Sequence, residues 1–136
     1  MEVFRVHILA ADKNFYEGPC VSLTVPTIGG EQGILAHHSD MIAAIMPGML
    51  RFQTPDSPVQ LAAVSSGMVK IEKNDVLVLV DSVERPEEID AARAQREADE
   101  AREAILQQRS RQEYQLAQAA LARAMNRLRV RAREIR

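Results

Sequence analysis

Four charged residues in the C-terminal part of the chain have the types and spacing of an anion-binding site. Asp90 and Arg93 lie at the start of one predicted helix, and Arg123 and Arg127 lie four positions apart on another. Like charges four apart on a helix repel by about 0.2–0.5 kcal/mol unless an anion lies between them. Guanidinium groups bind phosphate through paired hydrogen bonds. The set indicates either a phosphate site between two helices or a solvated basic face, and the spacing leaves both open.

The helices that would position these residues are predicted in residues 85–136. This segment contains no Gly and one Pro, Pro86, which fits the first position of a helix and is followed by acidic side chains. Ser110 and Glu113 have the spacing of a capping box, so a second helix should begin there. An antiparallel two-helix hairpin is expected, with a single long helix as the alternative.

Small residues at alternating spacings of three and four predict the faces through which the two helices pack. On the first helix they are Ala91, Ala94, Ala98, Ala101 and Ile105. On the second helix the corresponding residues are Tyr114, Ala117, Leu121, Ala124 and Leu128. Burying one methyl group contributes about 0.8 kcal/mol, against roughly 1.5–3 kcal/mol for a Leu or Ile side chain. The hairpin is therefore predicted to be marginally stable and able to open.

Residues 1–84 are predicted to form a small all-β sandwich or barrel, which makes the chain an α+β protein with a boundary between residues 84 and 85. Runs rich in β-forming residues predict short strands over 3–9, 20–25, 41–46, 49–52, 59–64, 68–71 and 76–80. Residues 29–33 include three glycines and are predicted to form a turn.

Composition and charge argue against several classes of protein. The net charge of −2 disfavours nucleic-acid binding by the whole chain, and no apolar run approaches the length of a membrane span. Cys20 is the single cysteine, which excludes an internal disulfide and favours a reducing compartment.

Residues 1–84 carry 5 basic and 10 acidic side chains, whereas residues 85–136 carry 12 Arg and 9 acidic side chains. A basic terminus on an acidic body predicts an acidic partner for the C-terminal segment.

Neither catalytic nor metal-binding residues are predicted. His37, His38 and Asp40 could suggest metal ligands, but adjacent side chains of an extended segment point to opposite faces, so a polar surface loop is preferred. Cys20 lies in a predicted strand with no neighbouring base. The glycines of residues 29–33 are not followed by the Lys and Ser or Thr of a phosphate loop.

Motifs along essentially the whole chain resemble the epsilon subunits of bacterial F-type ATP synthases. They comprise residues 30–35 with His38, residues 46–49, 65–69, 84–94 and 122–128. The resemblance implies a ten-stranded antiparallel β sandwich over residues 1–84 and an antiparallel two-helix hairpin over residues 85–136. It implies a noncatalytic subunit of the rotor's central stalk, at the cytoplasmic face of the bacterial membrane and attached to the membrane only through the complex.

The same resemblance implies partners for each part of the chain. The sandwich would pack against the gamma subunit and the ring of c subunits, with the loop carrying Glu31 and His38 near that ring. The hairpin would extend into the catalytic head, meet the alpha and beta subunits and block ATP hydrolysis. No cofactor is implied, but ATP is a possible regulatory ligand of the closed hairpin. The residues implied to hold it are Glu84, Ile89, Asp90, Arg93, Ala94, Arg123 and Arg127. The alternatives are a stand-alone nucleotide-sensing module and a β-sandwich adaptor with permanently paired helices.

Overall fold

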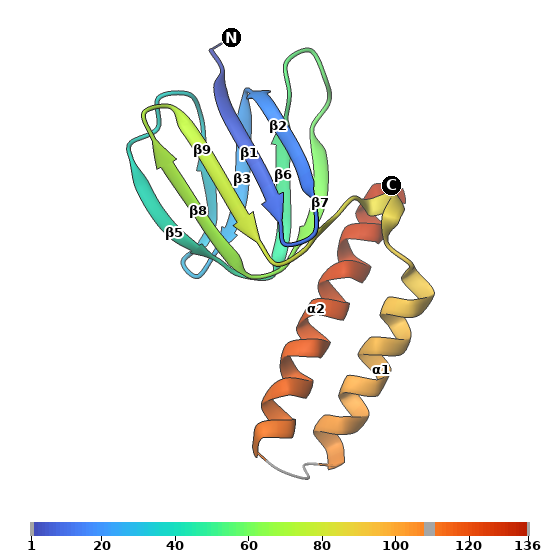
Figure 1. Ribbon diagram of the computed structural model, residues 1–136. Helices are drawn as coiled ribbons and strands as arrows, with labels where there is room; N and C mark the ends of the chain where they lie inside the picture. Colours follow the sequence, from blue (N-terminus) through green and yellow to red (C-terminus); the bar gives the residue numbers. More distant parts are fainter. Residues whose placement is uncertain (1, 108–110, 136) are drawn as a thin grey trace. The chain divides into compact units, whose positions relative to one another are not determined.

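Short runs of β-branched and other apolar residues, separated by turns, fold residues 1–84 into a β sandwich (Figure 1). The structure is a computed structural model that describes residues 2–107 and 111–135. In these residues ten strands form. They are β1 (Phe4–Ala10), β2 (Asn14–Cys20), β3 (Ser22–Thr27), β4 (Gly30–Ile34), β5 (Met41–Ile45), β6 (Gly48–Gln53), β7 (Gln60–Val64), β8 (Gly67–Glu72), β9 (Asp75–Val80) and β10 (Val83–Glu84). The predicted fold class is confirmed.

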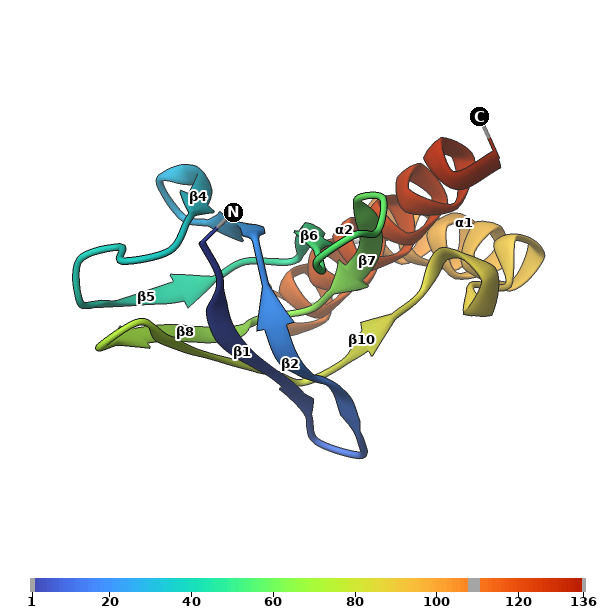
Figure 2. The ribbon, with the colours of Figure 1, turned by 90° about the horizontal axis from the view of Figure 1, so that it is seen from above.

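The strands are hydrogen-bonded in the order β10-β7-β6-β3-β5-β8-β9-β1-β2, and β4 pairs with β3. β3 and β5 are paired only briefly, through Thr27 and Ile45, and the sheet folds over at this point into two layers. Viewed from above, β1 and β2 lie on the opposite side of the sandwich from β6 and β7 (Figure 2). All strand pairs are antiparallel except β1 with β9, which run parallel from Arg5 opposite Asp75 to Ala10 opposite Val80.

The core between the layers is built from residues of this unit alone. Alternation places every second side chain inside, as in β1, where Phe4, Val6 and Ile8 are buried. The few aromatic side chains meet at Phe52, whose ring centroid lies 6.0 Å from that of Phe15 and 5.6 Å from that of Tyr16. The remainder of the core is mainly Val, Leu and Ile.

The strands β2 and β4 contain Gly or Pro, which are unfavourable in strands, and neither strand was predicted in full from the sequence. The expected turn over residues 29–33 is wrong, because only Ile28 and Gly29 form the turn and β4 begins at Gly30. Gly30 has a φ of +113°, which a residue without a Cβ tolerates. Backbone pairing along β3, from Thr27 opposite Gly30 to Leu23 opposite Ile34, holds this glycine-rich strand. In the same way, β2 continues through Gly18 and Pro19 by pairing with β1.

Residues 85–136 form a second compact unit, an antiparallel pair of helices preceded by a short turn of 3-10 helix. The turn is η1 (Pro86–Glu88), and the helices are α1 (Ala91–Gln107) and α2 (Arg111–Ile135). The hairpin is therefore confirmed and the single long helix is wrong. Ser110, the predicted cap of the second helix, lies outside the described residues. In the described part of the chain, neither helix combines the length and apolar character that crossing a bilayer demands.

Alanines line the contact between α1 and α2 in most of the predicted positions. Ala94, Ala98 and Ala101 of α1 are buried, as are Ala117 and Ala124 of α2. The prediction fails at Ala91, which is exposed in the first turn of α1. It also omitted Asn126 and Val130, which are buried although they lie off the predicted stripe.

Candidate functional site

Asp90 caps the N-terminus of α1 and so fixes where Arg93 and Ala94 lie. The backbone N–H of Arg93 donates to Asp90 Oδ1 at 3.0 Å, and the N–H of Ala94 donates to the Asp90 carbonyl at 2.9 Å. The first bond satisfies an amide group that a helix leaves unpaired in its first turn, and the second is the first backbone hydrogen bond of the helix itself. The preceding Ile89 is buried and donates its N–H to the Pro86 carbonyl at 3.2 Å. Four of the predicted ligand residues, Ile89, Asp90, Arg93 and Ala94, thus lie together at one capped helix start.

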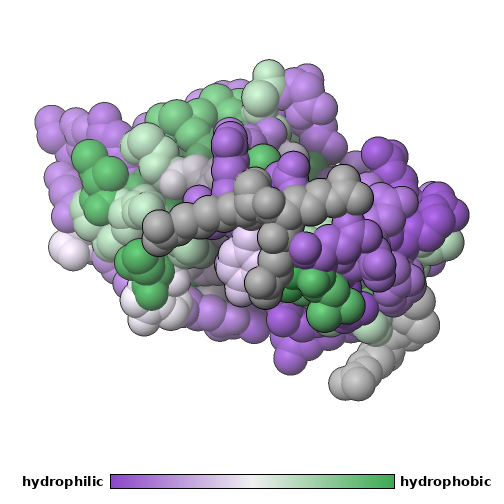
Figure 3. Space-filling view, turned by 90° about the horizontal axis from the view of Figure 1, so that it is seen from below, coloured by the Kyte–Doolittle hydropathy of each residue, from purple (hydrophilic) through white to green (hydrophobic). Residues whose placement is uncertain are grey.

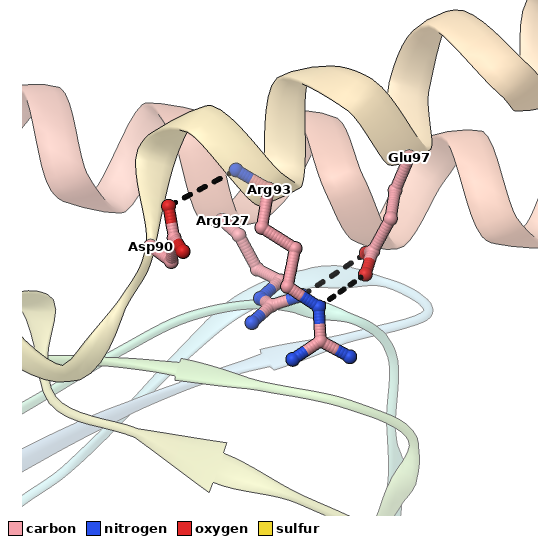
Figure 4. A network of polar contacts seen from close by, with 4 residues as sticks. All are labelled: Asp90, Arg93, Glu97 and Arg127. Atoms are coloured by element: carbon pink, nitrogen blue, oxygen red, sulfur yellow. Dashed lines mark hydrogen bonds and ion pairs between the residues drawn. The ribbon is translucent and has the colours of Figure 1, made fainter.

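Arg93 and Arg127 converge on Glu97, which lies one turn after Arg93 on α1 (Figure 4). Arg93 Nε lies 3.1 Å from Glu97 Oε1, and Arg127 Nη1 lies 3.1 Å from Glu97 Oε2. Because Arg127 belongs to α2, the carboxylate joins the two helices. The structure therefore brings together two of the three arginines predicted to bind an anion, and it places a negative group between them.

The exposure of the three side chains decreases from Arg93 through Glu97 to Arg127. Their side chains are 66%, 38% and 21% exposed, respectively. The two terminal nitrogens of Arg93 point away from Glu97 in Figure 4, so this guanidinium keeps donor groups for another acceptor. The cluster can hold an anion by charge-assisted hydrogen bonds, which are stronger than neutral ones.

Other predicted ligand residues are placed differently. Arg123 lies one turn before Arg127 on α2, but its side chain is exposed and does not join the Glu97 network. Glu84 ends β10, where it pairs with Ala63 of β7, and belongs to the sandwich unit. Ala94 is fully buried, so its methyl group can contribute only by packing.

Sequence reasoning missed Glu97. Its separation of four from Arg93 is the spacing of an ion pair on one helix, so this half of the network could have been found. The contact with Arg127 could not, because it depends on the register between α1 and α2.

The residues predicted to face a ring of partner subunits lie on and after β4. Glu31 on β4 accepts a hydrogen bond from the Arg51 guanidinium of β6. His38 follows β4, with its Nδ1 2.8 Å from the Ser39 carbonyl oxygen and its Nε2 3.4 Å from Gln32 Nε2. The two side chains therefore belong to one hairpin and its following loop.

The segment around His37 and His38 is a turn and not the extended segment assumed in the metal argument. His37 has a φ of +64°, and its N–H donates to Asn74 Oδ1 at 2.6 Å. Asp40 Oδ1 accepts the N–H of Lys73 at 3.0 Å, which ties the loop to the turn between β8 and β9. Within residues 2–107 and 111–135, no three His, Cys, Asp or Glu side chains are grouped as metal ligands.

Shifted pKa values occur on β2, away from the predicted ligand residues. Burial raises the pKa of the Cys20 thiol, which keeps it protonated and a poor nucleophile. Partial desolvation raises the pKa of Tyr16. The Arg5 guanidinium, 2.9 Å from the Glu17 carboxylate, lowers the pKa of that group.

Exposed hydrophobic side chains occur on the sandwich around β4 and β5. Ile28 and Leu35 flank β4 and are 83% and 64% exposed, and Ile42 on β5 is 69% exposed. Figure 3 shows apolar residues at the surface as separate green patches among polar ones. Ile28 and Leu35 lie on the same hairpin as Glu31, so apolar and charged groups are combined there.

Two family models together match nearly the whole chain. Residues 3–86 match the β-sandwich domain of the ATP synthase delta/epsilon chain, and residues 87–131 match its long alpha-helix domain. An ATP synthase epsilon chain of Nitrosospira multiformis is 37% identical over 128 residues, which cover 94% of this chain and 92% of the relative. The epsilon chain of Ruminococcus albus is also 37% identical, over 96% of this chain and 97% of the relative.

The fold is also similar to that of a chain in the mitochondrial ATP synthase of Euglena gracilis. The superposition has a TM-score of 0.80 and covers 89% of this chain and 76% of that chain, at 21% sequence identity. At this identity the likeness supports the fold alone.

Proposed function

Since this chain belongs to the delta/epsilon family of ATP synthase subunits, we propose that it is a noncatalytic epsilon subunit in the central stalk of a rotary ATP synthase. Relatives named as epsilon chains match it over almost their full length, which supports a subunit role over a stand-alone adaptor. In this role the chain lies at the cytoplasmic face of the membrane and reaches it only through the complex. Copurification with gamma and c subunits tests this assignment, and failure to copurify would contradict it.

The sandwich is proposed to be the part that docks on the rotor. The β4 hairpin and the loop after it present the exposed Ile28 and Leu35 beside Glu31 and His38. Exposed apolar residues within a polar surround are typical of protein–protein contacts. This combination supports docking of the β4 region on the c ring, with gamma as the second partner of the sandwich.

The hairpin is proposed to be the mobile regulatory part. Its seam is mostly alanine, so separating the helices loses little apolar burial. When extended, the arginine-rich α2 would contact acidic surfaces of the alpha and beta subunits and restrain ATP hydrolysis.

ATP is proposed to stabilise the closed hairpin, without a requirement for metal. The observation that carries this proposal is the convergence of Arg93 and Arg127, from two helices, on one anionic position. Asp90 sets the helix start, Ile89 and Ala94 provide packing beside it, and Arg123 would add a contact on binding. A ligand that binds only the closed form, at ten times its dissociation constant, stabilises that form by roughly 1.4 kcal/mol.

The test is a titration of the full chain with millimolar ATP, with and without magnesium, while its melting temperature is followed. ATP should raise the melting temperature of the wild-type chain and have a smaller effect on Arg93→Gln. Arg96→Gln is the matched control, because Arg96 is exposed on the same helix and loses the same charge. An unchanged melting temperature of the wild-type chain would remove the ATP-sensing proposal and leave the subunit assignment intact.

A further inference from the structure

We propose that Glu97 is an internal counter-anion that closes the hairpin when no nucleotide is bound and competes with a nucleotide's phosphates for Arg93 and Arg127. The inference rests on the nucleotide site proposed above and deepens it. It predicts that the chain keeps its hairpin closed without ATP and that its affinity for ATP is lower than the two arginines alone would provide.

The geometry supports this role because each carboxylate oxygen of Glu97 contacts a different arginine. Oε1 lies 3.1 Å from Arg93 Nε, and Oε2 lies 3.1 Å from Arg127 Nη1 (Figure 4). A phosphate bound between the same two guanidinium groups would accept hydrogen bonds in the same manner. Glu97 therefore occupies the position that a phosphate bound by both arginines would take.

Because both are negatively charged, Glu97 and a bound phosphate repel each other and compete for the same two arginines. A phosphate that contacts Arg93 and Arg127 brings its negative charge next to the carboxylate, and like charges at such distances repel strongly where solvent is partly excluded. Either Glu97 leaves the arginines or the phosphate binds less tightly. A ligand with several negative charges, such as a nucleoside triphosphate, offsets this repulsion better than inorganic phosphate does.

The location of Glu97 also suits a residue that holds α1 and α2 together, which we call the latch. It lies on α1 between the buried Ala94 and Ala98, so its backbone is fixed by the seam while its side chain remains 38% exposed. Another polar contact between the helices, Arg102 Nη2 to Met125 Sδ at 3.2 Å, involves one charge only. The Glu97 pair therefore adds a charge-based attraction to a seam that is lined by alanines.

The experiment compares Glu97→Gln with Glu100→Gln in the full chain. Glu100 is exposed on the same helix, so both variants lose one negative charge but only the first loses the contact between the helices. Without ligand, hydrogen exchange of the α1 and α2 amides should be roughly two- to fivefold faster in Glu97→Gln, the effect expected of a partly exposed ion pair. In ATP titrations, Glu97→Gln should bind more tightly than Glu100→Gln.

Each outcome decides one question. Equal exchange rates in the two ligand-free variants would overturn the latch. If Glu97→Gln binds ATP no more tightly than Glu100→Gln does, Glu97 does not compete with the phosphates for the two arginines. Absence of ATP binding by the wild-type chain and both variants would refute the proposed ATP sensing instead, and the exchange rates measured without ligand would still decide whether Glu97 closes the hairpin.

Discussion

At the scale of single residues, Asn74 connects three separate segments of the sandwich. It lies with Lys73 in the two-residue turn between β8 and β9, where both residues have positive φ values, +65° and +50°. Its Oδ1 accepts the N–H of His37 at 2.6 Å, and its Nδ2 donates to the Val3 carbonyl at 3.1 Å. Asparagine tolerates this left-handed conformation better than most residues.

Replacing Asn74 with Ala should therefore lower the free energy of unfolding of the sandwich by about 1–3 kcal/mol, through lost hydrogen bonds and backbone strain. Urea unfolding followed by the NMR signals of β9 measures the change. Asn74→Gly is the control, because glycine adopts the backbone conformation freely and loses only the hydrogen bonds. A loss in Asn74→Ala no greater than in Asn74→Gly would show that strain at this position contributes nothing.

At this scale, only those residues of the candidate site whose spacing along one helix is informative could be predicted from the sequence. Asp90 and Arg93 are recognisable as a helix start followed by a basic residue, and Arg127 as part of a basic face. The separation of Arg123 from Arg127, one exposed and the other in the network, depends on how α2 is rotated against α1. Periodicity does not specify that rotation when both helix faces contain small residues.

At the scale of elements, the alanine seam determines how closely α1 and α2 approach. Ala98 is fully buried in it, so a larger side chain has no space without separating the helices. Ala98→Leu should destabilise the closed hairpin by about 1–3 kcal/mol. Faster hydrogen exchange in α1 and α2, with unchanged exchange in β1 and β9, would be the sign of this effect.

Ala92→Leu provides the comparison for this prediction, because Ala92 is exposed on the same helix and gains the same side chain. It should leave the exchange rates of the hairpin unchanged. Slower exchange in Ala98→Leu than in the wild-type chain would mean that the seam contains unfilled space and is not closely packed.

Most elements could be predicted because their periodicity is strong. Strands such as β1 and β9 alternate or are continuously apolar, and the helices lack Gly entirely. The missed strands, β4 and all of β2 before Cys20, contain Gly30, Gly33, Gly18 and Pro19. These strands form because neighbouring strands supply hydrogen bonds, a tertiary effect that local propensity does not contain.

At the scale of the whole molecule, the division into two units predicts that the sandwich is autonomous. Its core consists of residues from Phe4 to Val83, so a chain ending at residue 84 retains every core residue. This fragment should unfold cooperatively and still assemble with the gamma subunit. A complex that contains it should hydrolyse ATP faster than one that contains the full chain.

Calorimetry of the fragment and ATPase assays of the reconstituted complex test this prediction. Loss of folding in the fragment would contradict the autonomy of the sandwich. An equal hydrolysis rate in the two complexes would contradict the inhibitory role of the hairpin while leaving the docking role in place.

The parallel pairing of β1 with β9 has a consequence for the time at which the sandwich can form during synthesis. Arg5 pairs with Asp75 and Ala10 with Val80, so one side of β1 is completed only after β9 has been made. Before then, β1 can pair only with β2, and its other edge is open to the wrong partners. About seventy residues must therefore be added after β1 before this edge is covered, as the pairs 5 with 75 and 10 with 80 show, and until then the growing chain is prone to aggregation.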